Sequence, residues 1–567
     1  MKILGISCFY HDAAAALIDD GKIIAAAEEE RFSRIKHDSS FPKLSINFCL
    51  DQAKIKPSGL DAVVFYEKPF LKFERIILSF LATAPYARGA FIDAFKIWLK
   101  EKLWIKALIL SNLKINPGKI FFSGHHISHA ASSFYTSPFK KTAILTCDGV
   151  GEWTTTTWGR GEGSKLYLNE EIRFPHSLGL FYSTFTQFLG FEINEGEYKV
   201  MGLAPYGKPR YVKKVEKLIS QESDGSFKLD LSYFNFLFSD KVSYSKKFID
   251  LFGSPIDPKS ADKVSSKYAD IAASAQKVLE EKLLVIARNL KKETGEDNLC
   301  YAGGVALNGV ANWRIFKEAG FKNIFVHPAA GDSGGAVGAA LYFYHHVLSK
   351  PRKNSFKNVY LGASNKIVDI EKFIKRSSIN AERLSDKALI ERVVQLLVSG
   401  KVVGWVRGAF EWGPRALGAR SILADPRSKK MKDLVNSKIK FREGFRPFAP
   451  VTLYEKGNTY FDVGDLIPPI LEYMLAVVPV RKKWQKSLGA ITHVDGTARP
   501  QLLRRTVNPL YYDLIKKFGQ KSGVSVLLNT SFNLKGQPIV NTYEEAYETF
   551  MNSGLDALVL ENYLIEK

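Results

Sequence analysis

Cysteine is scarce in this sequence. Only four cysteines occur in 567 residues, and they form neither a Cys-x-x-Cys motif nor another paired spacing. A disulfide framework and a thiolate zinc site are therefore both disfavoured.

Long apolar runs are also absent. No stretch of 18 consecutive apolar residues occurs, and the apolar start Met1–Cys8 is interrupted at His11-Asp12 before it reaches the length of a signal-peptide core. We therefore expect a cytoplasmic protein without a transmembrane segment.

Acidic residues are few relative to basic ones. Asp and Glu number 58 against 80 Lys and Arg, which leaves a formal charge of +22. A hydrophobic content of 46% argues against a disordered basic chain, and the length predicts two or more domains. The excess charge by itself suits nucleic acid, anionic lipid or an acidic small substrate equally well.

Part of this charge lies in residues 95–119, where lysines alternate with Trp and Leu. The pattern predicts an amphipathic basic helix. A helix packed on one face, a lid over an acceptor site and a membrane contact all fit it.

Two stretches share a pattern of strand, glycine-containing turn and strand. The first covers residues 3–27 with the turn Asp20-Gly21, and the second covers residues 142–159 with the turn 147–151. Asp-Gly between two apolar runs is a strong hairpin signal. The repetition predicts a duplicated α/β domain.

Two glycine-rich loops follow later strands. A helix predicted over residues 261–290 leads into a strand at 298–301, then into the loop 302–309, and the loop 329–336 repeats the arrangement. Backbone amides in such loops can closely approach a phosphate or a purine.

A second α/β unit is predicted beyond a polar, basic stretch at residues 349–365. A helix over 387–398 and a strand over 402–406 open this unit.

His125 and His129 are the strongest metal-ligand candidates. They are four residues apart, so they share one face of the predicted helix, whereas His126 points about 100° away. Asp148 and Asp332 lie in glycine-rich turns after predicted strands. Two imidazoles and two carboxylates suit iron(II), manganese or zinc, although histidines that merely pack are also common. A metalloprotease is disfavoured because His126 stands where the general-base glutamate is required.

Arginines and turn residues cluster in the C-terminal half. Residues 412–427 contain three arginines, and the strand 524–528 runs into Asn529-Thr530-Ser531-Phe532-Asn533. Such groups predict anion-binding loops on a sheet, with a surface salt-bridge array as the alternative.

An ordered series of motifs along the whole chain resembles the nodulation-factor, cephem and aminoglycoside O-carbamoyltransferases. The motifs are His11-Asp12-Ala13, Glu28-Glu-Glu-Arg31-Phe32, Lys36-His37, His125-x-x-x-His129, Lys199 to Gly207, Gly303 to Asn308, Gly413 to Gly418, and His493 to Thr497. The resemblance implies an actin-like (ASKHA, Kae1-like) domain fused to a YrdC-like α/β domain. It places the first domain at residues 1–350, a linker at 351–370 and the second domain at 371–567, and it makes a homodimer plausible.

The same resemblance assigns an adenylation site to the YrdC-like domain. Its Lys-x-Arg and Ser-x-Asn signatures match Lys440-Phe-Arg442 and Ser531-Phe-Asn533. This domain would make carbamoyl adenylate from carbamoyl phosphate and ATP with Mg²⁺, releasing pyrophosphate. Lys440 and Arg442 would be catalytic, and the phosphates and adenylate would be held by Arg415, Arg446, Arg499, Asn529, Ser531 and Asn533.

The resemblance assigns carbamoyl transfer to the Kae1-like domain. The family's ligands for Fe²⁺, or for Mn²⁺ or Zn²⁺, match His125, His129, Asp148 and Asp332. Carbamoyl adenylate would contact Lys36, Ser177, Gly179, Gly304 and Asn308. Either His11 or Asp12 would take the proton from an acceptor hydroxyl. The acceptor lid is expected within residues 66–112, where Lys68 and Arg75 suggest an anionic or sugar-like small molecule or glycan.

Two functions other than O-carbamoyl transfer fit parts of the sequence. A threonylcarbamoyl-type tRNA-modifying enzyme would fit both half-domains and the basic charge, but the motifs 199–207 and 413–420 favour O-carbamoyl transfer and make nucleic acid an unlikely partner. A non-catalytic nucleotide switch would leave the adenylation signatures without use.

Overall fold

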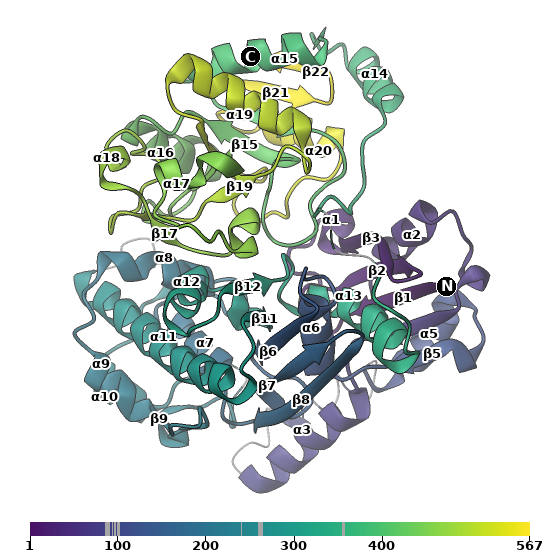
Figure 1. Cartoon of the computed structure of the whole chain (residues 1–567), viewed down its shortest axis with the longest axis vertical. Coiled ribbons are helices and arrows are strands. Elements are labelled where there is room, and N and C mark those ends of the chain that lie inside the picture. The colour runs from purple at the N-terminus through teal and green to yellow at the C-terminus, as the bar shows by residue number, and fades with distance from the viewer. Residues whose placement is uncertain are drawn as a thin grey trace. The chain divides into compact units, whose positions relative to one another are not determined.

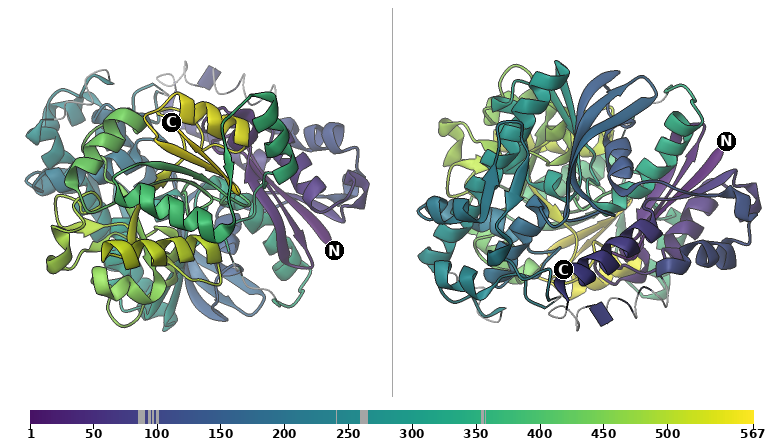
Figure 2. Two further views of the ribbon diagram at one scale, coloured as in Figure 1. Left: turned by 90° about the horizontal axis from the view of Figure 1, so that it is seen from above. Right: turned by 90° about the horizontal axis from the view of Figure 1, so that it is seen from below.

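The computed structural model describes residues 1–84, 91, 92, 95, 98, 102–239, 241–258, 265–353, 356 and 358–567. The chain forms two compact units, which Figures 1 and 2 show as ribbons. The first unit comprises residues 1–26 and 39–356, and the second comprises residues 27–38 and 357–567. Residues 27–38 thus group with the C-terminal unit, although the sequence places them inside the first predicted domain.

The first sheet of the first unit has the strand order β3-β2-β1-β4-β5. Strand β1 pairs antiparallel with β2 and parallel with β4, and β4 pairs parallel with β5. The strands are β1 (Lys2–Ser7), β2 (Ala14–Asp19), β3 (Lys22–Glu28), β4 (Ala62–Phe65) and β5 (Ile120–Phe122).

The second sheet repeats this topology in the order β8-β7-β6-β11-β12. Its first three strands are antiparallel neighbours, and β11 and β12 add in parallel. The strands are β6 (Lys141–Cys147), β7 (Thr154–Glu162), β8 (Lys165–Arg173), β11 (Asn298–Ala302) and β12 (Asn323–Val326). The shared topology confirms the predicted duplicated, actin-like α/β domain.

Helices α6 (His125–Phe134) and α13 (Asp332–Tyr342) lie against each other at the centre of this unit. Helix α13 also packs on β1, β2 and β4, whereas α6 packs on β6, β7 and β11 (Figure 1). Close approach requires glycine, because a Cβ at Gly338 would overlap the Ser128 carbonyl of α6. The pair of helices therefore connects the two sheets.

The remaining helices of the first unit surround the two sheets. Helix α11 begins at Ser266 rather than at the predicted residue 261, and residues 261–264 lie outside the described part. The helices are α2 (Lys43–Gln52), α3 (Pro69–Thr83), α5 (Ile105–Leu113), α7 (Leu178–Phe188), α8 (Glu197–Leu203), α9 (Val212–Val215), α10 (Lys246–Phe252), α11 (Ser266–Thr294) and α12 (Gly309–Glu318), and a small hairpin is formed by β9 (Ile219–Gln221) and β10 (Phe227–Leu229).

The prediction of one continuous helix over residues 95–119 is wrong. The described part contains a 3₁₀ turn at Lys102–Trp104, the helix α5 and a second 3₁₀ turn at Pro117–Lys119. Helix α5 ends because Lys114 adopts a left-handed conformation with φ 49°. Residues 96, 97 and 99–101, including Lys96 and Lys100, lie outside the described part.

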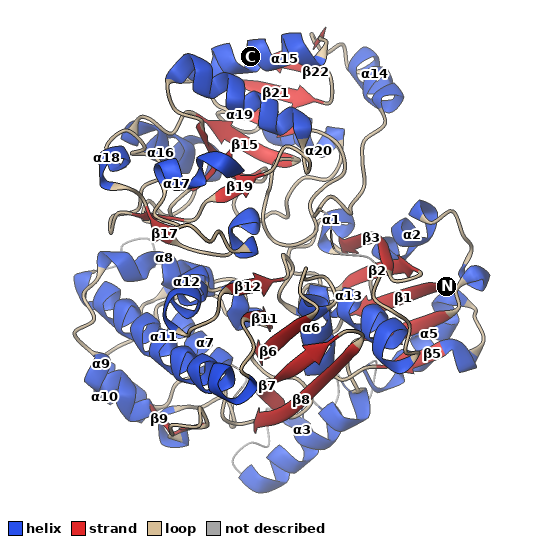
Figure 3. Ribbon diagram, in the orientation of Figure 1, coloured by secondary structure: helices blue, strands red, loops and turns tan. Residues whose placement is uncertain are grey.

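The second unit is built on one mixed sheet of order β13-β22-β21-β14-β15-β20-β16-β19, visible as red arrows in Figure 3. Its strands are β13 (Glu382–Arg383), β14 (Val403–Val406), β15 (Arg420–Ala424), β16 (Ala449–Leu453), β19 (Gln501–Leu503), β20 (Val526–Ser531), β21 (Ala557–Leu560) and β22 (Tyr563–Glu566), with a separate pair β17 (Val478–Pro479) and β18 (Thr497–Ala498). This is the α/β class expected for the second domain.

Helices α15 and α19 pack together over this sheet. Val393, Leu514 and Trp405 are at most 1% exposed in the hydrophobic core that they share. The helices of this unit are α1 (Glu30–Ser33), α14 (Ile367–Arg376), α15 (Asp386–Val398), α16 (Lys429–Val435), α17 (Gly457–Tyr460), α18 (Lys482–Gln485), α19 (Pro509–Ser522) and α20 (Tyr543–Met551). Among the described residues of both units, no helix is both long enough and apolar enough to cross a bilayer.

Candidate active sites in the two units

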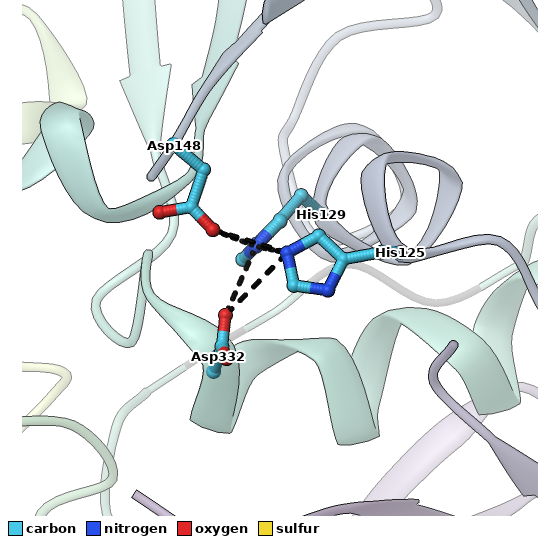
Figure 4. A group of neighbouring side chains, drawn as sticks. All are labelled: His125, His129, Asp148 and Asp332. Atoms are coloured by element: carbon cyan, nitrogen blue, oxygen red, sulfur yellow. Dashed lines mark hydrogen bonds and ion pairs between the residues drawn. The ribbon is translucent and has the colours of Figure 1, made fainter. Parts of the chain in front are cut away.

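Four buried side chains converge at the centre of the first unit (Figure 4). Asp148 Oδ2 lies 3.0 Å from His125 Nε2 and 3.2 Å from His129 Nε2. Asp332 Oδ1 lies 3.6 Å and 3.4 Å from the same two nitrogens. The structure thus brings together the four residues that the sequence nominates as metal ligands.

The secondary structure explains this convergence. His125 and His129 lie one turn apart on α6, Asp148 directly follows the buried strand β6, and Asp332 is the first residue of α13. Because α6 and α13 pack side by side, a helix face, a strand end and a helix start meet at one point.

The donor set fits a divalent cation. His125 Nε2 and His129 Nε2 face each other at 3.1 Å, so both imidazole edges point to the same place. Asp332 Oδ1 is buried and makes no hydrogen bond to the described residues, although both Nε2 atoms lie within 3.6 Å of it. Two nitrogen and two carboxylate donors suit Fe²⁺, Mn²⁺ or Zn²⁺.

The electrostatics of this cluster couples metal binding to the release of protons. Burial opposes a charge on His125, but the neighbouring carboxylates of Asp332, Asp148 and Glu67 raise its pKa to about 10. Burial also opposes a charge on His129, but the nearby carboxylates of Asp148 and Asp332 outweigh it and raise the His129 pKa. A metal ion must therefore displace protons from these imidazoles.

A second layer of contacts orients the cluster. Glu67 Oε2 lies 3.6 Å from His125 Nδ1 and accepts a 2.6 Å hydrogen bond from Lys72 Nζ. Tyr66 donates to Asp332 Oδ2 at 3.3 Å. His126 is directed to Thr146 Oγ1, at 2.6 Å, and does not join the cluster. No role for Lys72 was predicted from the sequence. The one feature that could have indicated it is its position in the first turn of α3, shortly after Tyr66-Glu67.

The His11–Asp12 pair lies on a strained turn after β1. Phe9 and Asp12 have φ values of 75° and 51°, which non-glycine residues rarely adopt. His11 Nδ1 lies 2.9 Å from Asp12 Oδ2. Burial opposes protonation, but Asp12 and then Asp332 and Asp148 raise the His11 pKa to about 9.

The predicted lid region contains two buried cations, Lys72 and Arg75. Arg75 on α3 is 8% exposed and donates to the Gly151 carbonyl at 2.7 Å, while Lys72 Nζ lies 5.2 Å from the centre of the Tyr10 ring. Lys68, by contrast, is exposed. Residues 85–90, 93, 94, 96, 97 and 99–101 of this region are outside the described part.

Three of the predicted adenylate contacts, Ser177, Gly179 and Gly304, lie against Asp148. Gly304 N donates to Asp148 Oδ1 at 2.9 Å, and a Cβ at Gly179 would lie 2.6 Å from the Asp148 carbonyl oxygen. The Ser177 hydroxyl lies 2.7 Å from the Gly149 carbonyl oxygen and caps α7. Asn308 caps α12 and exchanges hydrogen bonds with Gln276. The Ser177 and Asn308 side chains are thus engaged by the protein itself.

Lys440 is the centre of the candidate site in the second unit. Its Nζ donates to Asn533 Oδ1 at 2.6 Å and contacts Ser531 Oγ at 3.2 Å, besides both backbone carbonyls. Burial and then the charges of Arg442, Arg446 and Lys36 hold the Lys440 pKa well below its usual range. The two signatures, 91 residues apart, therefore meet at one buried lysine.

The other predicted phosphate ligands are placed by local contacts. Arg442 Nε donates to Asn436 Oδ1 at 2.8 Å, and Arg446 pairs with Glu443 at 3.4 Å. Asn529 Nδ2 donates to the Ala416 carbonyl at 3.2 Å, next to the half-buried Arg415.

One detail differs from the sequence predictions. Asn529 and Ser531 lie within β20 rather than in the loop after it, because β20 extends to Ser531. Arg499 directly follows β18 and is half-buried.

Most of the chain matches the two domains of one protein family. Residues 2–341 match the family described as carbamoyltransferase N-terminus, and residues 394–567 match carbamoyltransferase C-terminus. The chain belongs to the carbamoyltransferase family. This carbamoyltransferase is 46% identical to an uncharacterized protein of Synechocystis sp., over 100% of this chain and 96% of that protein. It is 37% identical to nodulation protein NolNO of Sinorhizobium fredii, over 99% of this chain and 79% of that protein.

Solved structures include proteins with a distant likeness to this carbamoyltransferase. Component A of the (R)-2-hydroxyglutaryl-CoA dehydratase of Acidaminococcus fermentans has a TM-score of 0.34 at 15% identity, covering 61% of this chain and 99% of that chain. The family match confirms the resemblance seen in the sequence and shows that the chain is an enzyme.

Proposed function

We propose that this carbamoyltransferase acts in two ATP-dependent steps at the two sites. Carbamoyl phosphate, ATP and water give carbamoyl adenylate, phosphate and pyrophosphate in the second unit, with Mg²⁺ accompanying ATP. Carbamoyl adenylate and an acceptor alcohol then give the O-carbamoylated product and AMP in the first unit. The observation that carries this proposal is the placement of Lys440 between Ser531 and Asn533 in a chain that also contains the His125 cluster.

The adenylation step needs stabilisation of negative charge. Once phosphate has left carbamoyl phosphate, a carbamate oxygen attacks the α-phosphorus of ATP and the bond to pyrophosphate breaks. Burial lowers the Lys440 pKa, and Arg442 and Arg446 bring their positive charges close enough to Lys440 to lower it further. Cations gathered in this way before substrate arrives stabilise the charge that develops on the α-phosphate. Arg415, Arg499 and Asn529 complete the phosphate and adenylate contacts.

The transfer step needs a base and a polarised carbonyl. The acceptor hydroxyl attacks the carbamoyl carbon, AMP leaves, and the hydroxyl proton passes to His11 or Asp12, which are 2.9 Å apart. A divalent cation held by His125, His129, Asp148 and Asp332 would supply Lewis acidity toward the carbamoyl carbonyl. The backbone at Gly179 and Gly304 lies against Asp148, where it can approach the adenylate phosphate.

The acceptor site is assigned to the same unit, near α3. Buried Arg75 and Lys72 line the side of the cluster occupied by Tyr10 and Glu67. Each cation is matched by a nearby carboxylate, since Lys72 pairs with Glu67 and the field of Glu152 acts on Arg75. A balanced set of donors and acceptors suits a polyhydroxylated small molecule or glycan rather than a strongly anionic one.

Separating the two steps tests this function. Pyrophosphate release is measured with ATP and carbamoyl phosphate in the absence of acceptor, for the wild type, Lys440→Ala and His125→Ala. We expect release to be lost in Lys440→Ala and retained in His125→Ala, while transfer from supplied carbamoyl adenylate shows the reverse pattern. No release by the wild type would contradict the proposal.

The substrate requirement distinguishes the tRNA alternative. A threonylcarbamoyl-type enzyme would release pyrophosphate with bicarbonate and threonine in place of carbamoyl phosphate. We expect pyrophosphate release from ATP with carbamoyl phosphate and without bicarbonate or threonine. A requirement for bicarbonate and threonine instead would assign the chain to tRNA modification.

A further inference from the structure

A short N-terminal segment is built into the second unit. This segment, Ala27–Asp38, leaves β3 and groups with residues 357–567. It binds both backbone polar groups of Gly413, because Glu28 Oε1 accepts from Gly413 N at 3.0 Å and Arg31 Nη2 donates to Gly413 O at 2.9 Å. About 380 residues of chain separate the two partners, so this contact is purely tertiary.

Glu28 and Arg31 are buried charges. They are 5% and 1% exposed, and Arg31 Nε lies 3.7 Å from Glu28 Oε2. The Arg31 guanidinium also lies 5.3 Å from the centre of the Phe410 ring. Burying two charges is unfavourable unless both are paired and hydrogen-bonded, so their position requires the contacts with each other and with Gly413.

The loop that they hold carries Arg415. At its far end, Glu411 Oε1 accepts hydrogen bonds from the backbone N–H groups of Leu417, Ala419 and Arg420, at 2.8, 2.6 and 3.1 Å. Gly413 and Gly418 both have positive φ, 104° and 108°. The loop is therefore fixed at its beginning by Glu28 and Arg31 and at its end by Glu411, with Arg415 between these two points.

The segment also contacts a second loop of the site. Arg34 donates to Ile539 O at 2.7 Å and to Pro538 O at 3.0 Å. These residues follow Ser531 and Asn533, and Asn533 Nδ2 donates to Gln537 O at 2.6 Å. One segment thus holds both the Arg415 loop and the loop that carries the Lys440 partners.

We propose that Glu28 and Arg31 are positioning residues for Arg415, and that the segment 27–38 is an integral part of the adenylate-forming site. The inference rests on the proposed function, since Arg415 matters through its phosphate contact. The segment 27–38 then has two effects on this site. The charge of Lys36 acts on Lys440, and Glu28 and Arg31 fix the loop geometry on which phosphate binding depends.

Kinetics of the full-length chain tests the positioning role. Carbamoyl-phosphate-dependent exchange of pyrophosphate into ATP is compared for the wild type, Arg31→Lys, Arg415→Ala and the double variant. Arg31→Lys keeps the charge but loses the planar fork, so we expect the KM for ATP to rise on the order of tenfold. In the Arg415→Ala background the same substitution should add less than about twofold.

Arg407→Lys is the matched control. Arg407 lies in the same unit, where its side chain pairs with Asp386 at 3.1 Å and donates to the Glu561 carbonyl rather than to Gly413. We expect its KM for ATP to remain within twofold of the wild-type value. A fully additive effect of Arg31→Lys and Arg415→Ala would overturn the positioning role, since it would show that Arg31 acts independently of Arg415.

Hydrogen exchange provides a readout that does not depend on the chemistry. Glu28→Gln and Arg31→Lys should accelerate amide exchange in residues 413–418 while the exchange of β14 and β21 stays unchanged. Unchanged exchange in 413–418 would overturn the inference even if the wild-type chain adenylates. Amide exchange could also accelerate in the variants while the wild-type chain shows no pyrophosphate exchange. That result would support the contact of Glu28 and Arg31 with this loop and would contradict only the proposed function.

Discussion

The Glu67 carboxylate lies 3.6 Å from His125 Nδ1, while Nε2 of the same ring lies 3.0 Å from Asp148. The imidazole is thus held between two buried carboxylates, one on each nitrogen. A carboxylate behind a metal-binding histidine fixes the ring orientation and makes its other nitrogen a stronger donor. Lys72, at 2.6 Å from Glu67, keeps that carboxylate ionised, and the Glu67 pKa is held at about 2 despite burial.

Glu67→Gln should weaken metal binding. The amide keeps the size of the side chain but removes the negative charge behind His125, and we expect affinity for Fe²⁺ or Zn²⁺ to fall about tenfold. Competition with a chromophoric chelator measures this. Glu171→Gln, which alters an exposed pair with Arg173 on β8, serves as the control. Equal affinities for the two variants would show that Glu67 does not act on the metal site.

Asp12→Asn should shift the pH dependence of carbamoyl transfer. Asp12 raises the His11 pKa, which is about 9 in the presence of the carboxylate. Removing the negative charge lowers that pKa, so the neutral imidazole needed as a base becomes available at lower pH. We expect the acid limb of the rate of transfer from supplied carbamoyl adenylate to move to lower pH. A limb that does not move would exclude His11 as the titrating base.

ATP binding should be accompanied by proton uptake at Lys440. Burial and neighbouring cations lower the Lys440 pKa, and the negative charge of bound phosphate raises it again. Calorimetric titration with ATP in buffers of different ionisation enthalpy detects this uptake. We expect it to disappear in Lys440→Met and to persist in Lys401→Met, which alters an exposed pair with Asp556. Uptake that persists in Lys440→Met would assign it to another group.

Gly338→Ala should loosen the metal cluster through the helix packing. An added Cβ would overlap the Ser128 carbonyl, so α6 and α13 must move apart, at a cost of about 1–3 kcal/mol in the free energy of unfolding. Gly331→Ala is the control, because a Cβ there meets no atom within 4 Å. Denaturant unfolding measures both. A Gly338→Ala protein as stable as Gly331→Ala would show that the contact between these helices is not tight.

Much of the local structure follows from sequence signals. The turn at Asp20-Gly21, the repeated pattern at residues 142–159 and the helix α15 are in the places predicted, because hairpin turns and helix periodicity depend on neighbouring residues. The prediction of one helix over residues 95–119 was wrong. Lysines and apolar residues alternate there as in an amphipathic helix, but the left-handed conformation of Lys114 ends helix α5, and Pro117 begins a separate 3₁₀ turn.

The candidate sites show the same limit. The spacing of His125 and His129 puts both on one helix face, the glycine-rich turns indicated Asp148 and Asp332, and the family resemblance added Lys440 and Ser531. The sequence did not reveal that the side chains of Ser177 and Asn308 are engaged in helix capping, or that Lys72 pairs with Glu67. Those contacts join residues whose partners are set by packing rather than by spacing.

The sequence by itself determined the duplicated α/β pattern, the family and the residue types at both sites, because periodicity, turns and motifs are properties of neighbouring positions. Tertiary structure alone decided that Glu67 lies behind His125 and that Glu28 and Arg31 hold Gly413. Such contacts bridge up to about 380 residues, and buried charges find partners wherever the folded chain brings a complementary group within hydrogen-bonding distance.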